Sequence, residues 1–200
     1  LIMALCLPFA YFFLLPSDLI DYFESLIAVS FFSSNILFWQ ESGYWGAANE
    51  LKPLLHTWSL AVEEQYYVLF PVFLMLMWRF RKRWIFGAFL VFAGISFLIS
   101  EWGAYNRPTA NFFLLPTRGW ELAIGAGIAF YFLYKKTTIR SLLAHKVLGE
   151  TAGLLGLCMI FFAVFSYSGS TPFPSSYALI PTIGTGLLLL FSSPNTIVGR

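Results

Sequence analysis

Charged residues are scarce in this chain. Lys, Arg, Asp and Glu together make up 11% of its 200 residues, whereas hydrophobic residues make up 58%. An ordinary soluble domain is about 25% charged, so the composition excludes that class and predicts a membrane protein. The formal net charge of +2 is too small to indicate binding to DNA or RNA, and no nucleic-acid partner is expected.

Cysteines and several familiar catalytic motifs are also rare or missing. Cys6 and Cys158 lie within apolar runs, where we expect them to pack as small hydrophobic residues rather than to form a disulfide or bind a metal. The chain has no GxxxxGK[ST] loop and no HExxH motif, which removes the usual support for nucleotide hydrolysis and zinc proteolysis. It also lacks the GxSxG nucleophile elbow of many hydrolases.

Long apolar runs recur along the chain between polar or Pro/Gly-rich connections. Because backbone groups inside a bilayer must be hydrogen-bonded within the protein, and no run alternates like a barrel strand, these runs are predicted to be helices. Several are slightly shorter than the roughly 20 residues that cross a bilayer. We therefore expect an all-α fold, a polytopic transmembrane helix bundle with about seven spans, near residues 1–15, 19–38, 59–78, 84–100, 117–134, 151–167 and 177–193.

The chain begins inside an apolar run and without a start methionine. We therefore expect residues 1–200 to form a single transmembrane domain that is incomplete at its N-terminus and also at its C-terminus. No internal repeat, low-complexity tract or separate soluble domain is visible in the sequence.

Basic residues predict how the spans are oriented. Four of them crowd the connection 79–83, and four more fall within 135–149. The positive-inside rule places both connections on the cytoplasmic side. The connections 39–58, 101–116 and 168–176 would then lie outside.

The second apolar run is expected to be one span that starts on the cytoplasmic side. Asp18, Asp21 and Glu24 lie in its first turns, where carboxylates complement the positive end of a helix dipole. Ser33, Ser34 and Asn35 lie toward its far end and are expected to make packing contacts with another helix.

The third apolar run carries polar groups that cost several kcal/mol each to bury in hydrocarbon. On a helix that turns about 100° per residue, His56, Ser59, Glu63 and Tyr67 share one face, whereas Glu64 is rotated away from it. We expect this polar face to look into the bundle or into a cavity.

A second polar group lies at the start of the fifth apolar run, in the sequence PTRGWEL. Arg118 and Glu121 are three residues apart, a spacing that permits an ion pair on a helix, either structural or functional. Glu63 and Arg118 both lie within about two turns of the outer end of their helices, at 1.5 Å per residue. We predict that Arg118 reaches the same polar cluster as Glu63, with Glu121 holding its guanidinium. Gly125 and Gly127 would let a neighbouring helix or a ligand approach.

The residues 52–67, KPLLHTWSLAVEEQYY, closely resemble membrane acyltransferase family 3, the OafA-like O-antigen and peptidoglycan O-acetylases. That family's hallmark reads HTWSLxVEEQFY, and the visible departure here is Tyr66 in place of Phe. The block 115–125, LPTRGWELAIG, is similar to a second family motif. The resemblance implies an integral membrane O-acyltransferase that moves an acyl group, most often acetyl, from cytoplasmic acyl-CoA to a hydroxyl of a glycan at the outer side.

The resemblance also implies a location, partners and roles for particular residues. It implies a multi-pass protein of the bacterial inner (plasma) membrane, in contact with lipid, that uses acetyl-CoA as acyl donor without a permanently bound cofactor or metal. The acceptor would be O-antigen, peptidoglycan or exopolysaccharide. Relatives carry an essential arginine and histidine in their first spans, which we expect before Leu1, and many continue into an SGNH-type domain. The implied catalytic residues are Glu63, His56 and Arg118, and the implied substrate contacts are Trp58, Ser59, Tyr67 and Glu121.

Acyl transfer to a sugar hydroxyl needs a base, a cation or donor for the developing oxyanion, and exclusion of water from the thioester. Glu63 can orient a histidine or accept the proton itself, and Arg118 can supply the cation. The basic inner connections can attract the phosphates of coenzyme A, although the positive-inside rule already explains their charge.

Two other functions fit the same residues. Intramembrane charges also mark transport routes, which would make the protein a transporter or flippase for lipid-linked sugars. Alternatively, Glu63 and Arg118 merely pair within a non-catalytic membrane scaffold. The specificity of the two motifs favours the enzyme.

Overall fold

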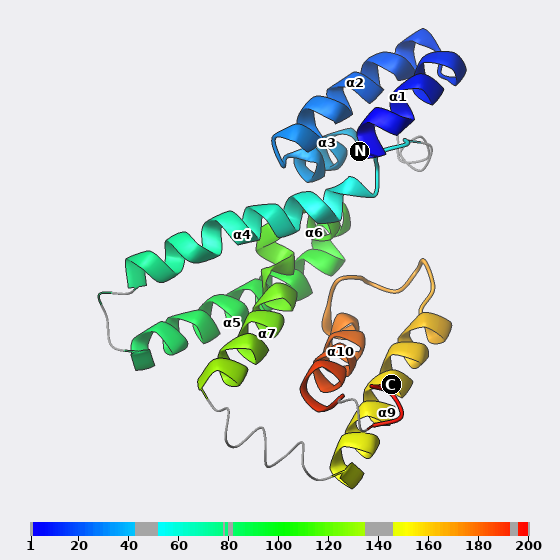
Figure 1. Ribbon diagram of the computed structural model, residues 1–200. Helices are drawn as coiled ribbons and strands as arrows, with labels where there is room; N and C mark the ends of the chain where they lie inside the picture. The colour runs from blue at the N-terminus through cyan, green and yellow to red at the C-terminus, as the bar shows by residue number, and fades with distance from the viewer. Residues whose placement is uncertain are drawn as a thin grey trace. The chain divides into compact units, whose positions relative to one another are not determined.

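The computed structural model describes residues 2–42, 52–77, 79, 82–134, 146–192 and 196–199. Every regular element in these ranges is helical and none is a strand, so the all-α prediction is confirmed (Figure 1). The elements are α1 (Ile2–Phe13), α2 (Pro16–Ser30), α3 (Ser34–Ser42), α4 (Thr57–Met77), α5 (Lys82–Asn106), α6 (Pro108–Phe113), α7 (Leu115–Tyr134), α9 (Lys146–Ser166), the 3-10 helix η2 (Ser176–Ala178) and α10 (Leu179–Phe191).

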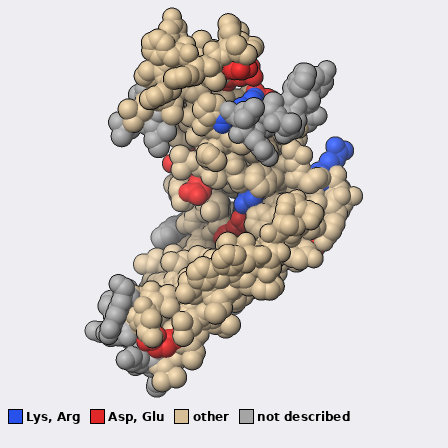
Figure 2. Space-filling model, turned by 90° about the vertical axis from the view of Figure 1, so that its right-hand side faces the viewer, with Lys and Arg blue, Asp and Glu red and all other residues tan. Residues whose placement is uncertain are grey.

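Three helices in the described ranges are long and apolar enough to cross a membrane, namely Thr57–Met77, Trp84–Asn106 and Val147–Ser166. The expected count of seven spans is not confirmed. Helix α7 is 20 residues long, but Arg118 and Glu121 in its first turns lower its apolar character. On the face shown in Figure 2, charged side chains form small separate patches among uncharged residues, as the composition leads one to expect.

Backbone contacts divide the chain into two compact units. The first unit comprises Leu1–Ile85 and Thr109–Leu115, and the second comprises Phe86–Pro108 and Pro116–Arg200. The family-like motif of α4 thus belongs to the first unit and most of the motif of α7 to the second. That residues 1–200 form a single transmembrane domain stays a prediction.

The expectation of one continuous helix over residues 19–38 is wrong. Helix α2 ends at Ser30 and α3 begins at Ser34, and between them Phe32 adopts a φ of 54°, in the left-handed region that bulky residues rarely occupy. This conformation turns the chain sharply. Helix α2, with 15 residues, extends about 22 Å at 1.5 Å per residue, short of the roughly 30 Å hydrocarbon layer.

An ion-pair cluster shows that α3 returns along α2. The Lys52 ammonium lies 3.8 Å from the Asp21 carboxylate on α2 and 2.6 Å from the Glu41 carboxylate on α3. Residues from both sides of the turn therefore meet the same cation. Asp21, expected to interact with the helix dipole, instead contacts Lys52, while Asp18 does lie in the first turn of α2.

The core of the first unit joins distant parts of the sequence. The Tyr22 hydroxyl donates a hydrogen bond to the Met3 carbonyl at 3.3 Å, which ties α2 to α1. Partly buried apolar side chains, among them Trp39 and Trp58, surround this core. Its buried members are Ala10, Tyr22, Phe38, Leu54 and Phe113.

In the second unit, α9 and α10 approach each other through a pair of glycines. A Cβ added to Gly156 would lie 2.5 Å from the Gly184 carbonyl oxygen, and one added to Gly184 would lie 2.7 Å from the Gly156 carbonyl oxygen. Because these atoms belong to the backbone, no side-chain movement would relieve the clash. Gly184 is therefore a packing glycine.

Candidate functional site

The polar residues of α4 divide between two faces. Ala61, Val62 and Tyr66 are buried, and the adjoining face carries Glu63, which is partly exposed, together with exposed Ser59 and Tyr67. Glu63 forms no ion pair or hydrogen bond with another residue in the described part of the chain. This face is accessible, and its predicted position toward the bundle or a cavity stays a prediction.

His56 precedes the first turn of α4 and is exposed. The Ser59 hydroxyl donates a hydrogen bond to the His56 carbonyl at 3.2 Å, so the two residues are adjacent. Their catalytic and substrate-binding roles, and those of Glu63 and Tyr67, stay predictions.

On another side of α4, the Gln65 amide pairs with the Asn35 amide of α3. The Gln65 amide donates to the Asn35 carbonyl oxygen at 2.8 Å and to the Phe32 carbonyl at 2.7 Å. The Asn35 amide donates to the Phe113 carbonyl at 3.1 Å, and Asn35 is 1% exposed. Gln65 therefore fixes α4 to the strained turn before α3 and, through Asn35, to α6.

Two further contacts fix the start of α4. The Ser34 hydroxyl donates to the Thr57 carbonyl at 3.1 Å, and the Thr57 hydroxyl donates to the Leu54 carbonyl at 2.7 Å. Ser34 and Asn35 thus make the helix-packing contacts that the sequence predicts, whereas the Ser33 hydroxyl donates to the Ala28 carbonyl at 3.1 Å, in the segment that precedes it.

Sequence reasoning gave Gln65 no role. The available signal was that Asn35 and Gln65 are both amides in apolar runs, and two amides can satisfy each other's donors and acceptors.

Trp58 lies against α6. Its ring centroid is 4.5 Å from that of Phe112 and 5.5 Å from that of Phe113, the latter in an edge-to-face arrangement. Such aromatic contacts stabilise packing beyond the buried area alone. They account for a tryptophan at this position, and its predicted role in substrate binding stays a prediction.

In the second unit, Arg118 and Glu121 form the ion pair that their spacing predicts. The Arg118 Nη1 atom lies 3.2 Å from Glu121 Oε2, and the side chains are 14% and 21% exposed. The Arg118 guanidinium also lies over the ring of Phe173, 5.6 Å from its centroid. The other carboxylate oxygen, Glu121 Oε1, is buried and accepts no hydrogen bond from the part of the chain that the structure describes.

A serine on α5 holds the first turn of α7. The Ser96 hydroxyl donates to the Pro116 carbonyl at 2.7 Å and accepts a hydrogen bond from the Trp120 N–H at 3.0 Å. A Cβ on Gly119 would lie 3.1 Å from Phe92 and 3.3 Å from the Ser96 hydroxyl. Gly119 therefore allows α5 to approach closely enough for Ser96 to bind the turn that carries Arg118.

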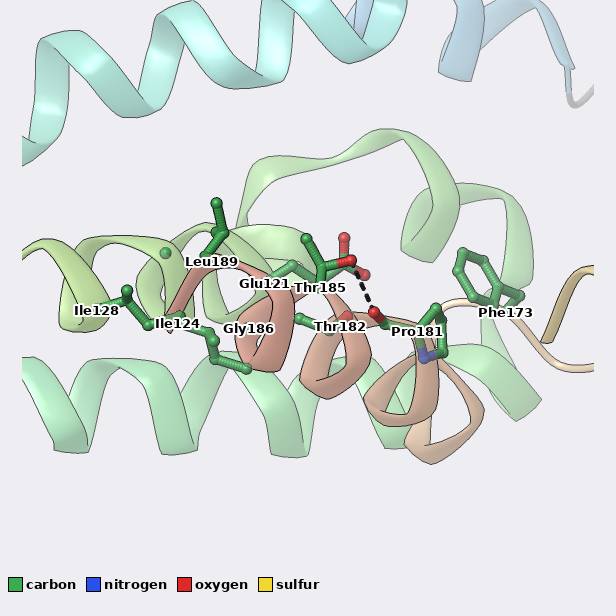
Figure 3. Close-up of a pocket in the computed structure, with 10 residues that line it drawn as sticks. Glu121, Ile124, Ile128, Phe173, Pro181, Thr182, Thr185, Gly186 and Leu189 are labelled. Carbon is green, nitrogen blue, oxygen red and sulfur yellow. Dashed lines mark hydrogen bonds between the residues drawn. The ribbon is translucent and has the colours of Figure 1, made fainter. Parts of the chain in front are cut away.

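Glu121 lines a pocket of about 320 Å³ between α7 and α10 (Figure 3). Its walls are mostly apolar, and one end is formed by Phe173 from the connection before α10. The lining residues are Glu121, Ile124, Gly125, Ile128, Phe173, Pro181, Thr182, Thr185, Gly186 and Leu189.

Two contacts from the end of α5 hold the connection that carries Phe173. The Ser100 hydroxyl donates to the Pro174 carbonyl at 3.1 Å. The Ser176 N–H donates to the Glu101 carboxylate at 2.7 Å. Both contacts hold the backbone of this connection within three residues of Phe173.

Glu63 and Arg118 belong to different units, and their meeting in one polar cluster stays a prediction. So does the cytoplasmic placement of 79–83 and 135–149, because residues 80, 81 and 135–145 lie outside the described residues. Among the residues that are described, no group of three or more His, Cys, Asp or Glu side chains is arranged to hold a metal ion.

Comparison with known proteins gives a match over nearly the whole chain. Residues 1–199 match the family Acyl_transf_3, described as an acyltransferase domain. An uncharacterised protein of Haemophilus influenzae is 28% identical over 175 residues, which cover 83% of this chain and 69% of that protein. The peptidoglycan O-acetyltransferase OatA of Listeria monocytogenes is 27% identical over 149 residues, which cover 70% of this chain but 23% of that protein. No solved structure matches the chain.

Proposed function

This chain belongs to the acyltransferase domain family, and on that basis we propose that it is an integral membrane O-acyltransferase acting on a cell-surface glycan. The donor is acyl-CoA, most often acetyl-CoA, on the cytoplasmic side. The observation that carries the proposal is the family match over residues 1–199. The name of the Listeria relative, a peptidoglycan O-acetyltransferase, supports a glycan as the acceptor.

The reaction joins the acceptor oxygen to the acyl carbon. The sugar hydroxyl attacks the thioester carbonyl, an oxygen–carbon bond forms and the carbon–sulfur bond breaks. A base takes the hydroxyl proton, and that proton leaves with coenzyme A as its thiol. In this proposal Glu63 orients His56 or accepts the proton itself, and the exposure of His56 and partial exposure of Glu63 support access by a substrate hydroxyl.

Arg118 is the proposed partner of the oxyanion that develops on the thioester carbonyl. It lies at the start of α7, where Glu121 holds its guanidinium at 3.2 Å and Ser96 holds the backbone around it. A cation fixed before the reaction needs little rearrangement as the negative charge forms, which supports a role in stabilising that charge. Trp58, Ser59, Tyr67 and Glu121 are the proposed acceptor contacts.

We place the protein in the bacterial inner membrane, with 79–83 and 135–149 in the cytoplasm. The basic residues of these connections support that orientation and suit the phosphates of coenzyme A. Arg81→Cys and Arg140→Cys, introduced after Cys6 and Cys158 are replaced by serine, should resist an impermeant thiol reagent added outside. Ser170→Cys is the control that should react. Labelling of the first two variants from outside would contradict the orientation.

The activity can be tested with membranes that contain the full-length protein carrying this chain. Radiolabelled acetyl-CoA is supplied on the cytoplasmic side with peptidoglycan, O-antigen or exopolysaccharide as acceptor. Labelled ester on one of these glycans supports the proposal. Movement of a lipid-linked sugar without acylation would instead support the flippase, and the absence of both would leave a scaffold.

A further inference from the structure

The polar side chains that line the pocket between α7 and α10 offer hydrogen-bond acceptors to a ligand. Of its lining residues, three have polar side chains: Glu121, Thr182 and Thr185. The Thr182 hydroxyl donates its proton to the Ala178 carbonyl at 2.6 Å. The Thr185 hydroxyl donates its proton to the Pro181 carbonyl at 2.9 Å (Figure 3). A hydroxyl has one proton, so what both oxygens still offer to a ligand is acceptor capacity.

Glu121 adds an acceptor of the same kind. Its Oε2 atom contacts Arg118, whereas the buried Oε1 atom accepts no hydrogen bond from the described residues. Because Oε1 has essentially no accessible surface, a ligand in the pocket can reach the carboxylate only through Oε2. An anionic ligand would be repelled by the Glu121 carboxylate and would receive no hydrogen bond from the lining side chains.

The remaining walls are apolar, and one position leaves free volume. Ile124, Ile128 and Leu189 flank the space, and a Cβ added to Gly125 would meet no atom within 4 Å. A volume of about 320 Å³ is near the lower end of ligand pockets, which run from about 300 to 1,000 Å³. The pocket therefore suits one small group with both an apolar face and several donors.

We propose that this pocket binds an uncharged sugar ring of the glycan acceptor. One sugar hydroxyl donates to Glu121 Oε2, which also contacts Arg118, others donate to the two threonine oxygens, and the carbon face of the ring lies along the apolar walls. This inference rests on the proposed function and adds to it the position of the acceptor and its lack of negative charge. Thr182, Thr185, Phe173 and Gly125 join Glu121 as acceptor contacts.

The first experiment fills the pocket. Gly125→Leu places a side chain in the open volume beside Glu121, while Gly94→Leu on α5, where an added Cβ also meets nothing within 4 Å, is the matched control. With the full-length protein, Gly125→Leu should raise the KM for the glycan at least about tenfold and leave the KM for acetyl-CoA unchanged. Gly94→Leu should change neither.

The second experiment removes an acceptor without filling the pocket. Thr185→Val keeps the branched shape but loses the oxygen, so it should raise the glycan KM several-fold. A hydrocarbon chain in the pocket would bind this variant equally well or better, and an unchanged glycan KM would therefore overturn the proposal. Thr185→Val also keeps the test decisive if Gly125→Leu does not fold.

The outcomes separate this inference from the proposed function. If the wild-type protein acylates no glycan, the proposed function fails. If it is active but Gly125→Leu has a normal glycan KM, or raises the KM for acetyl-CoA instead, the proposed function stands and the pocket is not the acceptor site.

Discussion

The two family-like motifs place their charged residues differently. On α4, Glu63 lies on an accessible face and makes no ion pair with another described residue. The uncharged Gln65 instead forms the hydrogen bonds that join α4 to Phe32 and Asn35. On α7, the charged residues themselves are enclosed and bind each other at 3.2 Å. The α4 motif thus has one side that packs against the rest of the first unit and one that is accessible. The α7 motif has a largely buried ion pair, and Glu121 of this pair lines a pocket.

This difference shows that agreement with a motif does not by itself tell which residues act on a substrate. In the α4 motif, the residues that hold the helix in place and the proposed catalytic residues alternate along the same turns. In the α7 motif, Arg118 is held by Glu121, so one residue both supports the other and lines the pocket. Substitutions that separate these roles test the comparison directly.

The largest effect is expected for Glu63. Glu63→Gln keeps the shape of an accessible side chain and removes its capacity as a base, so acyl transfer should fall by about 10²–10⁴-fold, the usual contribution of general acid–base catalysis. The amount of folded protein in the membrane should change little. Radiolabelled acetyl transfer measures the activity, and Glu64→Gln, on the neighbouring position rotated by about 100°, is the control. Normal turnover in Glu63→Gln would remove this residue from the mechanism.

Arg118 should give the next largest effect. Arg118→Ala removes a cation held by a carboxylate and should lower kcat by about 10²–10³-fold, as loss of an oxyanion contact does. Arg118→Lys keeps the charge but loses the planar fork, so it should be nearly as impaired. Full activity of the lysine variant would show that charge alone suffices. Glu121→Gln tests whether the two residues act as a unit. If they do, Glu121→Gln alone should lower the activity, but the double variant Arg118→Ala with Glu121→Gln should be little less active than Arg118→Ala.

The helices of this chain follow from its sequence more closely than their arrangement does. The predicted runs 59–78 and 117–134 correspond to α4 and α7 within a few residues, because long apolar segments favour helices in any tertiary context. The ion pair of Arg118 with Glu121 could be predicted for the same reason, since an i,i+3 contact is set by the local helix alone.

What the sequence did not predict depends on contacts between distant residues. The turn at Phe32 is not marked by glycine or proline, and it is held by the Gln65 amide from another helix. The pocket likewise needs α7, α10 and the connection with Phe173 to come together, although the sequence predicts that a helix or a ligand approaches Gly125 and Gly127. Residues 52–67 resemble the family strongly, but resemblance does not reveal which of their faces is buried.

A packing contact in the second unit should affect stability without taking part in chemistry. Gly184→Ala places a methyl group 2.7 Å from the Gly156 carbonyl oxygen, and since a backbone atom must move, the free energy of unfolding should fall by about 3 kcal/mol, the upper part of the usual range for overpacking. Thermal unfolding in detergent measures the change. Gly94→Ala, at an open position on α5, should be neutral. An unchanged Gly184→Ala protein would mean that α9 and α10 are further apart.

The smallest effect on stability is expected for the hydrogen bond between Gln65 of α4 and Asn35 of α3. Gln65→Leu leaves the Asn35 carbonyl oxygen without the 2.8 Å donor and should reduce the free energy of unfolding by about 1–3 kcal/mol, the cost of an unsatisfied buried group. Asn35→Leu should cost a similar amount, because it removes the same pair from the other side. The double variant Asn35→Leu with Gln65→Leu should lose less than the sum of the two, since neither amide is then left without its partner. Strict additivity would show that the two amides do not interact.

A fall in kcat as large as that of Glu63→Gln, with stability unchanged, would place Gln65 among the catalytic residues and remove the distinction between the two sides of α4.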